Sequence, residues 1–178
     1  MKIEQSPPQS PESTPHESSL YHGPRDFIPK TDYNPSPVSS GTFTVIVVDD
    51  NQADVWLVQE ALEENGVHSE LFVAADGEEA FTLIDRIENG QLPCPHLVVL
   101  DLNLPKVNGF EVLKRLRSSQ KCGKKPVVIF SSSNAQSDRK EAARLGAAGY
   151  IEKPSNLSDL PDVGRRLKEV LFASQFLH

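Results

Sequence analysis

Five polar side chains that could do chemistry follow short apolar runs at four separate places in the chain. They are Asp49, Asp50, Asp101, Ser131 and Lys153. If the apolar runs are parallel strands of one sheet, their carboxyl ends meet at one edge and these side chains share a cleft. Three carboxylates in one cleft repel one another, so either one is protonated or a cation joins them. The pattern therefore predicts a cation site.

The predicted cation is Mg²⁺, because a hard cation suits oxygen ligands and Mg²⁺ uses only one or two carboxylates while keeping several waters. We expect Asp50 and Asp101 to be direct ligands and the main-chain carbonyl of Asn103 to be a third. Asp49 would act through water or hold Lys153. Open coordination positions would remain for phosphate oxygens.

Asp101 is the candidate nucleophile, and we expect a phosphoryl group to be transferred to its carboxylate. Such a transfer needs in-line positioning and neutralisation of the charge on the transferring group. Mg²⁺ would supply part of that neutralisation. Lys153 would pair with a second phosphoryl oxygen, and the Ser131 hydroxyl would donate to a third.

Three of these residues also have a simpler interpretation. Asp49 and Asp50 could cap the helix that follows them, since Asp is a preferred cap residue. Lys153 could be an ordinary surface lysine. Because it would take a coincidence at four strand ends to assemble this set, we favour the joint site.

From residue 42 the chain alternates strand and helix signals. Short, mainly apolar runs predict strands at 43–48, 70–74, 97–100, 126–130 and 149–151. The run at 43–48 is near-continuous and β-branched, as expected of a parallel strand that is buried on both faces. Apolar residues at helical spacing predict helices at 52–65, from 77 to about 89, from about 109 through 116, at 135–145, and a last one that ends near 172 or 175. Five such βα units imply one open, doubly wound α/β sheet with helices on both faces.

Three helix starts carry specific predictions. Asp76 with Glu79, and Asn108 with Glu111, fit capping boxes. A proline at 161 is tolerated only in the first turn of the last helix. That helix would then begin late, with Ser158 as its cap.

Residues 1–41 differ in composition from residues 42–178. They hold eight of the fourteen prolines and few aliphatic residues, so they cannot bury enough apolar surface to offset their ordering entropy. We expect a disordered extension before a single domain at 42–178. A partner-docking segment around Tyr21, Phe27 and Tyr33 is the alternative.

The whole-chain totals exclude several classes of protein. A net charge of −7 argues against a general nucleic-acid binder. The apolar runs are too short to span a bilayer, and the N-terminus has no secretory pattern. Cys94 and Cys122 are isolated, as expected of free thiols in a reducing cytoplasm. We therefore expect a cytoplasmic protein.

The same residues carry a resemblance to a known family. The motifs are VVDD at 47–50, DLNLP at 101–105 with Gly109 after it, Ser131, Tyr150 and Lys153-Pro154. On these motifs, residues 42–172 resemble the receiver domain of two-component response regulators, in the CheY-like single-domain form. DLNLPK at 101–106 and QEAL at 59–62 resemble most the regulators that pair with bacterial phytochrome-type histidine kinases.

The resemblance implies a flavodoxin-like fold with strand order 2-1-3-4-5. It implies that Asp101 is the phosphoacceptor, that Asp49 and Asp50 are the acidic pair for Mg²⁺, and that Lys153 is the family's lysine. It also makes Ser131 the switch hydroxyl and Tyr150 the switch aromatic. The Lys153–Pro154 bond is often cis in such proteins.

The function implied is signal transduction in a phosphorelay. The phosphoryl group would come from a sensor histidine kinase, and the closer resemblance implies a kinase of the phytochrome type. Output would pass through a downstream protein target, a phosphotransfer protein, or a homodimer formed by the fourth helix, fifth strand and fifth helix. We expect no direct contact with nucleic acid or membrane. We also expect no enzyme activity beyond phosphorylation and dephosphorylation of the protein itself.

Three other functions remain to be weighed. A phosphatase of the haloacid dehalogenase type also uses an Asp nucleophile and Mg²⁺, but it needs a second Asp as general acid where this chain has Asn103. A dinucleotide enzyme would need a glycine-rich turn after the first strand. A pseudo-receiver, acting only by protein contact, is disfavoured because every residue of the reactive type is present.

Overall fold

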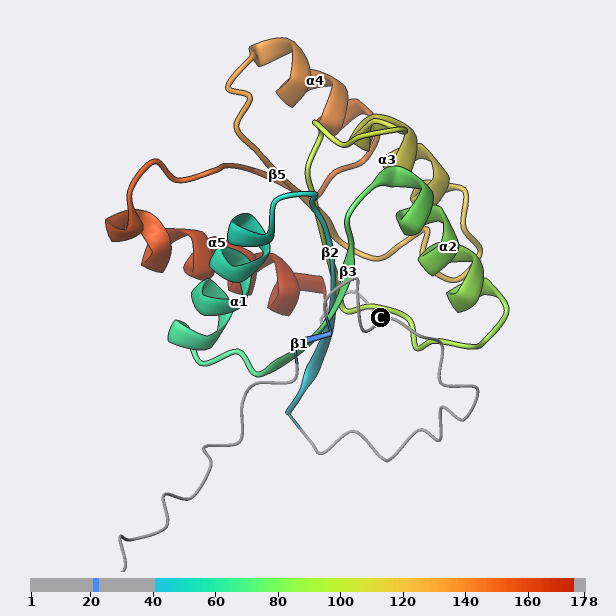
Figure 1. Ribbon diagram of the computed structural model, residues 1–178, viewed down its shortest axis with the longest axis horizontal. Helices are drawn as coiled ribbons and strands as arrows, with labels where there is room; N and C mark the ends of the chain where they lie inside the picture. The colour runs from blue at the N-terminus through green and yellow to red at the C-terminus, as the bar shows by residue number, and fades with distance from the viewer. Residues whose placement is uncertain (1–20, 23–40, 175–178) are drawn as a thin grey trace, which may run out of the picture.

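The computed structural model describes residues 21–22 and 41–174, and these form one parallel sheet flanked by helices (Figure 1). The strands are β1 (Tyr21–His22), β2 (Phe43–Val48), β3 (Ser69–Ala74), β4 (Leu97–Leu100), β5 (Val127–Ser131) and β6 (Gly149–Glu152). Their order in the sheet is β1-β3-β2-β4-β5-β6, and every pair is parallel. Apart from the short β1, this is the predicted order 2-1-3-4-5, so the fold class is confirmed.

Five helices cover the two faces of the sheet. They are α1 (Gln52–Glu64), α2 (Gly77–Glu88), α3 (Gly109–Arg117), α4 (Gln136–Arg144) and α5 (Leu160–Ala173), with a 3₁₀ turn η1 (Leu157–Asp159) before α5. Helices α1 and α5 lie on one face, while α2 and α3 lie on the other (Figure 1). This is the doubly wound arrangement that alternating strands and helices predict.

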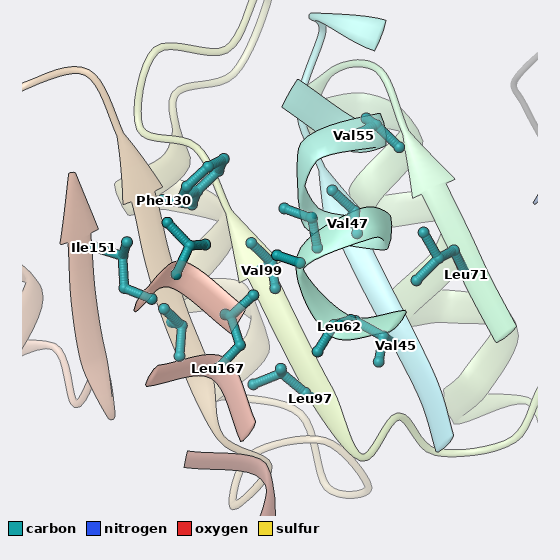
Figure 2. Packing of buried hydrophobic residues seen from close by; sticks show 14 of the residues in the cluster. Val45, Val47, Val55, Leu62, Leu71, Leu97, Val99, Phe130, Ile151 and Leu167 are labelled. Carbon is teal, nitrogen blue, oxygen red and sulfur yellow. The ribbon is translucent and has the colours of Figure 1, made fainter. Parts of the chain in front are cut away.

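The sheet separates two hydrophobic clusters, because successive side chains of a strand point to opposite faces. Val45 and Val47 of β2 pack with Leu62 of α1 and Leu167 of α5, as Figure 2 shows. The alternate residues of β2 point to the cluster formed with α2 and α3. Burial on both faces explains why the central strands read as continuous apolar runs.

The predicted caps are confirmed at two helices, with a difference in detail. The Asp76 carboxylate accepts a hydrogen bond from the Glu79 N–H at 2.9 Å, and the Glu79 side chain accepts one from the Ala75 N–H at 2.8 Å. Asn108 accepts from the Glu111 N–H at 3.1 Å. Glu111 itself pairs with a lysine one turn later, so only half of that capping box forms.

Helix α5 begins at Leu160, and Pro161 falls in its first turn as predicted. The prediction that Ser158 caps this helix is wrong. The η1 turn continues through Ser158 to Asp159, so Asp159 holds the N-cap position, although its side chain accepts no capping hydrogen bond. Further along, a Cβ on Gly164 would collide with the Ala61 carbonyl of α1, which explains a glycine inside a helix at this close crossing.

Strand β1 was not predicted. Tyr21 and His22 pair in parallel with Leu71 and Phe72 at the outer edge of β3. The predicted disorder of the rest of this extension, and the docking alternative at Phe27 and Tyr33, lie outside the described residues. Every described helix is too short or too polar to cross a bilayer.

Candidate functional site

The predicted carboxylates meet where β2 and β4 end. These strands are neighbours with Val48 opposite Leu100, so the next residues, Asp49 and Asp101, lie side by side. One carboxylate oxygen from each of Asp49, Asp50 and Asp101 lies within 4.8 Å of the others. Asp49 and Asp101 are buried and Asp50 is exposed. The acidic cluster that the sequence predicted is therefore present.

Backbone N–H groups fix the orientation of the two buried carboxylates. Asp49 Oδ1 accepts from the Asn51 N–H at 3.0 Å, and Asp101 Oδ1 accepts from the Asn103 N–H at 3.1 Å. The second oxygen of each carboxylate, Oδ2, is left to face the ammonium group of the site lysine described next. Each of these backbone hydrogen bonds holds one oxygen of its carboxylate in place and so fixes the direction in which the other oxygen points.

Gly109 permits the close approach of α3 to this strand end. A Cβ at this position would collide with the main-chain carbonyl of Asp101 and with the Cα of Leu102. The Gly109 N–H donates to the Leu102 carbonyl at 3.0 Å. The glycine in the motif is therefore required by packing against the residue that carries the carboxylate.

Lys153 lies at the centre of the site. Its Nζ is 2.8 Å from Oδ2 of each of Asp49, Asp54 and Asp101. The lysine follows β6, and its N–H donates to the Ser131 carbonyl at 3.0 Å. Its side chain is only 11% exposed, so the interpretation as an ordinary surface lysine does not hold.

Asp54 is the one carboxylate contacting Lys153, among the described residues, that sequence reasoning missed. It lies in the first turn of α1, after the N-cap Asn51, which places it over the carboxyl edge of the sheet. The signal that could have found it is its position one helical turn beyond the Asp49–Asp50 pair.

The protonation behaviour of the cluster reflects burial and crowding. Burial raises the pKa of Asp49 to about 6, against the opposing effect of hydrogen bonds from Lys153 and the Asn51 N–H. For Lys153, burial disfavours the ammonium, but hydrogen bonds to Asp101, Asp49 and Asp54 outweigh it and raise the pKa above its ordinary value. Four carboxylates, those of Asp49, Asp50, Asp54 and Asp101, gather at the site, where Lys153 is the one lysine that contacts any of them among the described residues, as expected of a site that binds a cation.

The donor set fits Mg²⁺. Three carboxylate oxygens converge, and Asp50 is exposed to solvent, which suits a cation that keeps several of its waters. Asn103 is tied to Asp101 through its N–H, and its carbonyl as a further ligand stays a prediction.

The predicted switch residues are connected through the loop after β5. Ser131 is completely buried, and its hydroxyl accepts a 3.4 Å hydrogen bond from the Ser133 N–H. The Tyr150 hydroxyl donates to the Ser133 carbonyl at 2.9 Å. The Arg139 guanidinium lies 4.4 Å from the centre of the Tyr150 ring. Ser131 and Tyr150 thus bond to the same loop residue.

One expectation near the site is wrong. The Lys153–Pro154 peptide bond is trans, as are all the described peptide bonds.

The sheet is parallel and doubly wound, and an acidic cluster with a paired lysine lies at the carboxyl ends of its strands. These features define a flavodoxin-like α/β domain with an acidic site of the kind that binds cations. Residues 45–164 match the model of the response regulator receiver domain. The chain therefore belongs to the receiver domain family of two-component signalling, whose members partner with sensor histidine kinases and bind Mg²⁺ or Mn²⁺ at an acidic pocket.

Two curated relatives show the extent of the sequence similarity. The chain is 32% identical over 127 residues to the probable methanogenesis regulatory protein FilR2 of Methanothrix harundinacea, covering 71% of this chain and 82% of that protein. It is 35% identical over 117 residues to the response regulator Rcp1 of Synechocystis, covering 65% of this chain and 80% of Rcp1.

Two solved structures show the similarity of the fold. The phosphorylated cyanobacterial phytochrome response regulator RcpA superposes with a TM-score of 0.67 at 34% identity, covering 75% of this chain and 96% of RcpA. The Mn²⁺-bound form of Rcp1 superposes with a TM-score of 0.64 at 32% identity, covering 71% of this chain and 92% of Rcp1.

Proposed function

We propose that this protein is a single-domain response regulator that accepts a phosphoryl group from a histidine kinase on Asp101, with Mg²⁺, and signals by protein contact. The observation that carries the proposal is the convergence on Asp101: its carboxylate belongs to an acidic cluster with Asp49 and Asp50, and its Oδ2 lies 2.8 Å from the Lys153 ammonium. That is the charge arrangement that phosphoryl transfer to a carboxylate requires.

In the proposed reaction an Asp101 oxygen attacks the phosphorus of a phosphohistidine. The P–O bond to Asp101 forms as the P–N bond breaks, and the imidazole leaves with the electron pair. Lys153 balances charge on one phosphoryl oxygen, and the Ser131 hydroxyl donates to another. Mg²⁺, held by Asp49, Asp50 and Asp101 with the Asn103 carbonyl, supplies further neutralisation of charge when bound.

The switch that we propose starts at Ser131. If its hydroxyl turns toward the phosphoryl group, the weak hydrogen bond from the Ser133 N–H is lost. Because the Tyr150 hydroxyl donates to the carbonyl of Ser133, a change at Ser133 would also reach Tyr150. The two-state equilibrium of this loop would then depend on phosphorylation. Its effect would reach the surface formed by α4, β6 and α5, where a protein target or a second copy of the chain would bind.

The partner that we propose is a phytochrome-type sensor histidine kinase, because RcpA, which is 34% identical to this chain, is a phytochrome response regulator. Onward transfer to a phosphotransfer protein is a further possible output. We propose a cytoplasmic protein without enzyme activity toward other substrates. Asn103 stands where a haloacid-dehalogenase phosphatase would need its acid.

Phosphotransfer profiling tests this proposal. Each purified, autophosphorylated histidine kinase of the host is mixed with the protein and Mg²⁺, and loss of label from the kinase is followed over time. We expect rapid transfer from one kinase to wild type and none to Asp101→Asn. If no kinase transfers its label, or if the variant is labelled equally, the proposed function is wrong.

A further inference from the structure

Asp54 contacts the site lysine, yet the proposed reaction gives it no part. Its Oδ2 accepts hydrogen bonds from Lys153 Nζ and from Asn51 Nδ2, each at 2.8 Å. The side chains of Lys153 and Asp54 are only 11% and 14% exposed. Because the pair is largely shielded from solvent, its geometry is more strongly defined than that of a surface ion pair.

Lys153 has as many carboxylate partners as it has hydrogens to donate. An ammonium group has three N–H donors, and Nζ lies 2.8 Å from one carboxylate oxygen of each of Asp49, Asp54 and Asp101. An incoming phosphoryl oxygen therefore needs one of these contacts to be released.

The three partners differ in what phosphoryl transfer demands of them. Asp101 would become the acyl phosphate, and Asp49 belongs to the acidic cluster that would hold the cation. Within the described residues, Asp54 lies outside that cluster, and it is held in place by α1 and by Asn51. Asp54 is thus the partner that can keep its contact with Lys153 while the other two carboxylates engage the phosphoryl group and the cation.

We propose that Asp54 is a positioning residue for phosphoryl transfer, which holds the Lys153 ammonium beside Asp101 throughout the reaction. The inference rests on the proposed function and deepens it. Asp54 acts only through Lys153 and contacts neither the phosphoryl group nor the cation. Without Asp54, the flexible lysine stem would sample positions from which it cannot reach the phosphoryl oxygen.

A purely structural role for Asp54 is the competing explanation. An acidic residue in the first turn of a helix is stabilised by the helix dipole. Glu111 offers a matched control: it is the third residue of α3 after the N-cap Asn108, as Asp54 is the third residue of α1 after Asn51. Glu111, however, pairs with the exposed Lys114.

The first experiment measures the rate of phosphorylation by a small acyl phosphate with saturating Mg²⁺. We expect the rate to fall on the order of tenfold in Asp54→Ala, as for loss of a charge-assisted hydrogen bond, and less in Asp54→Asn, whose amide oxygen still accepts. Glu111→Gln should stay within about twofold of wild type. The affinity for Mg²⁺ alone should change by less than about threefold in each variant, because none removes a proposed ligand.

The second experiment is a double-mutant cycle with Lys153→Ala. If Asp54 acts through the lysine, Asp54→Ala should slow phosphorylation when it is made in the wild-type protein. The same substitution should have no further effect when it is made in the Lys153→Ala variant. In metal-free protein, the ¹H–¹⁵N signal of the Lys153 ammonium should broaden or disappear in Asp54→Ala and persist in Glu111→Gln. This second measurement requires no phosphorylation.

The outcomes separate the two proposals. Additive effects in the cycle, an unchanged or faster rate in Asp54→Ala, or a fall in Mg²⁺ affinity equal to the fall in rate would overturn the positioning role while leaving the proposed function intact. A wild-type protein that stays unlabelled would overturn the proposed function, and this inference with it.

Discussion

The buried Asp49 carboxylate should destabilise the metal-free protein at neutral pH. Burial raises its pKa from the ordinary value of 3.8 to about 6, and a rise of that size corresponds to about 3 kcal/mol. The folded state therefore binds a proton more tightly than the unfolded state does. The favourable contribution of that proton is complete below about pH 4 and is lost as the pH rises through about 6. Asp49→Asn removes this dependence.

The assay is urea unfolding of wild type and Asp49→Asn in a chelator, at a series of pH values. We expect the variant to be the more stable protein at neutral pH, by up to about 3 kcal/mol, and the difference to shrink toward about pH 4. Added Mg²⁺ should stabilise wild type and narrow the gap, since a bound cation compensates the charge. Asp85→Asn is the control, because Asp85 is exposed and pairs with the exposed Arg115, so this variant should change stability by less than about 1 kcal/mol.

A metal-free variant that is less stable than wild type at neutral pH would refute this reasoning. It would mean that the hydrogen bonds from Lys153 and the Asn51 N–H outweigh the burial of the charge. A difference in stability that does not vary with pH would also refute it, because the proposed cause is titration of one carboxyl group.

Three further substitutions test other parts of the site. Gly109→Ala should destabilise the fold by about 1–3 kcal/mol in urea unfolding, because the added Cβ collides with the Asp101 carbonyl; equal stability would contradict that packing. Lys153→Ala should leave the far-UV circular dichroism of the folded protein unchanged but abolish the response to phosphorylation. Without metal it should lower the free energy of unfolding by about 3 kcal/mol or more, because the buried carboxylates of Asp49 and Asp101 lose their partner. Tyr150→Phe should lose the bond to the Ser133 carbonyl and about 1 kcal/mol of stability, while acyl-phosphate labelling of Asp101 stays near the wild-type rate; loss of labelling would place Tyr150 in the reaction itself.

The sheet could be predicted from sequence because its strands are short, apolar and bounded by polar residues. The bounds 43–48 and 97–100 match β2 and β4 fully. The strand order implied by the family resemblance makes these two strands neighbours in the sheet. That order predicts that Asp49 and Asp101, which follow the two strands, lie side by side. The register Val48 opposite Leu100 is what brings these residues together.

Other features depended on contacts that local patterns do not encode. Asp54 reaches Lys153 across 99 positions of sequence, and its helix position alone fits an ordinary first-turn acid. The Ser158 cap failed because a 3₁₀ turn moved the helix start to Leu160. Strand β1 is two residues long, too short for an alternation pattern to be recognised.

The central claim is that Asp101 accepts the phosphoryl group, and intact-protein mass spectrometry tests it most directly. Purified protein is incubated with Mg²⁺ and a small acyl phosphate, and the modified residue is then located by peptide mapping. We expect wild type to gain one phosphoryl group that is stable in acid, labile in base and located on Asp101, and we expect Asp101→Asn to gain none. A phosphoryl group of equal yield in Asp101→Asn, or one mapped to another residue of wild type, would contradict the account.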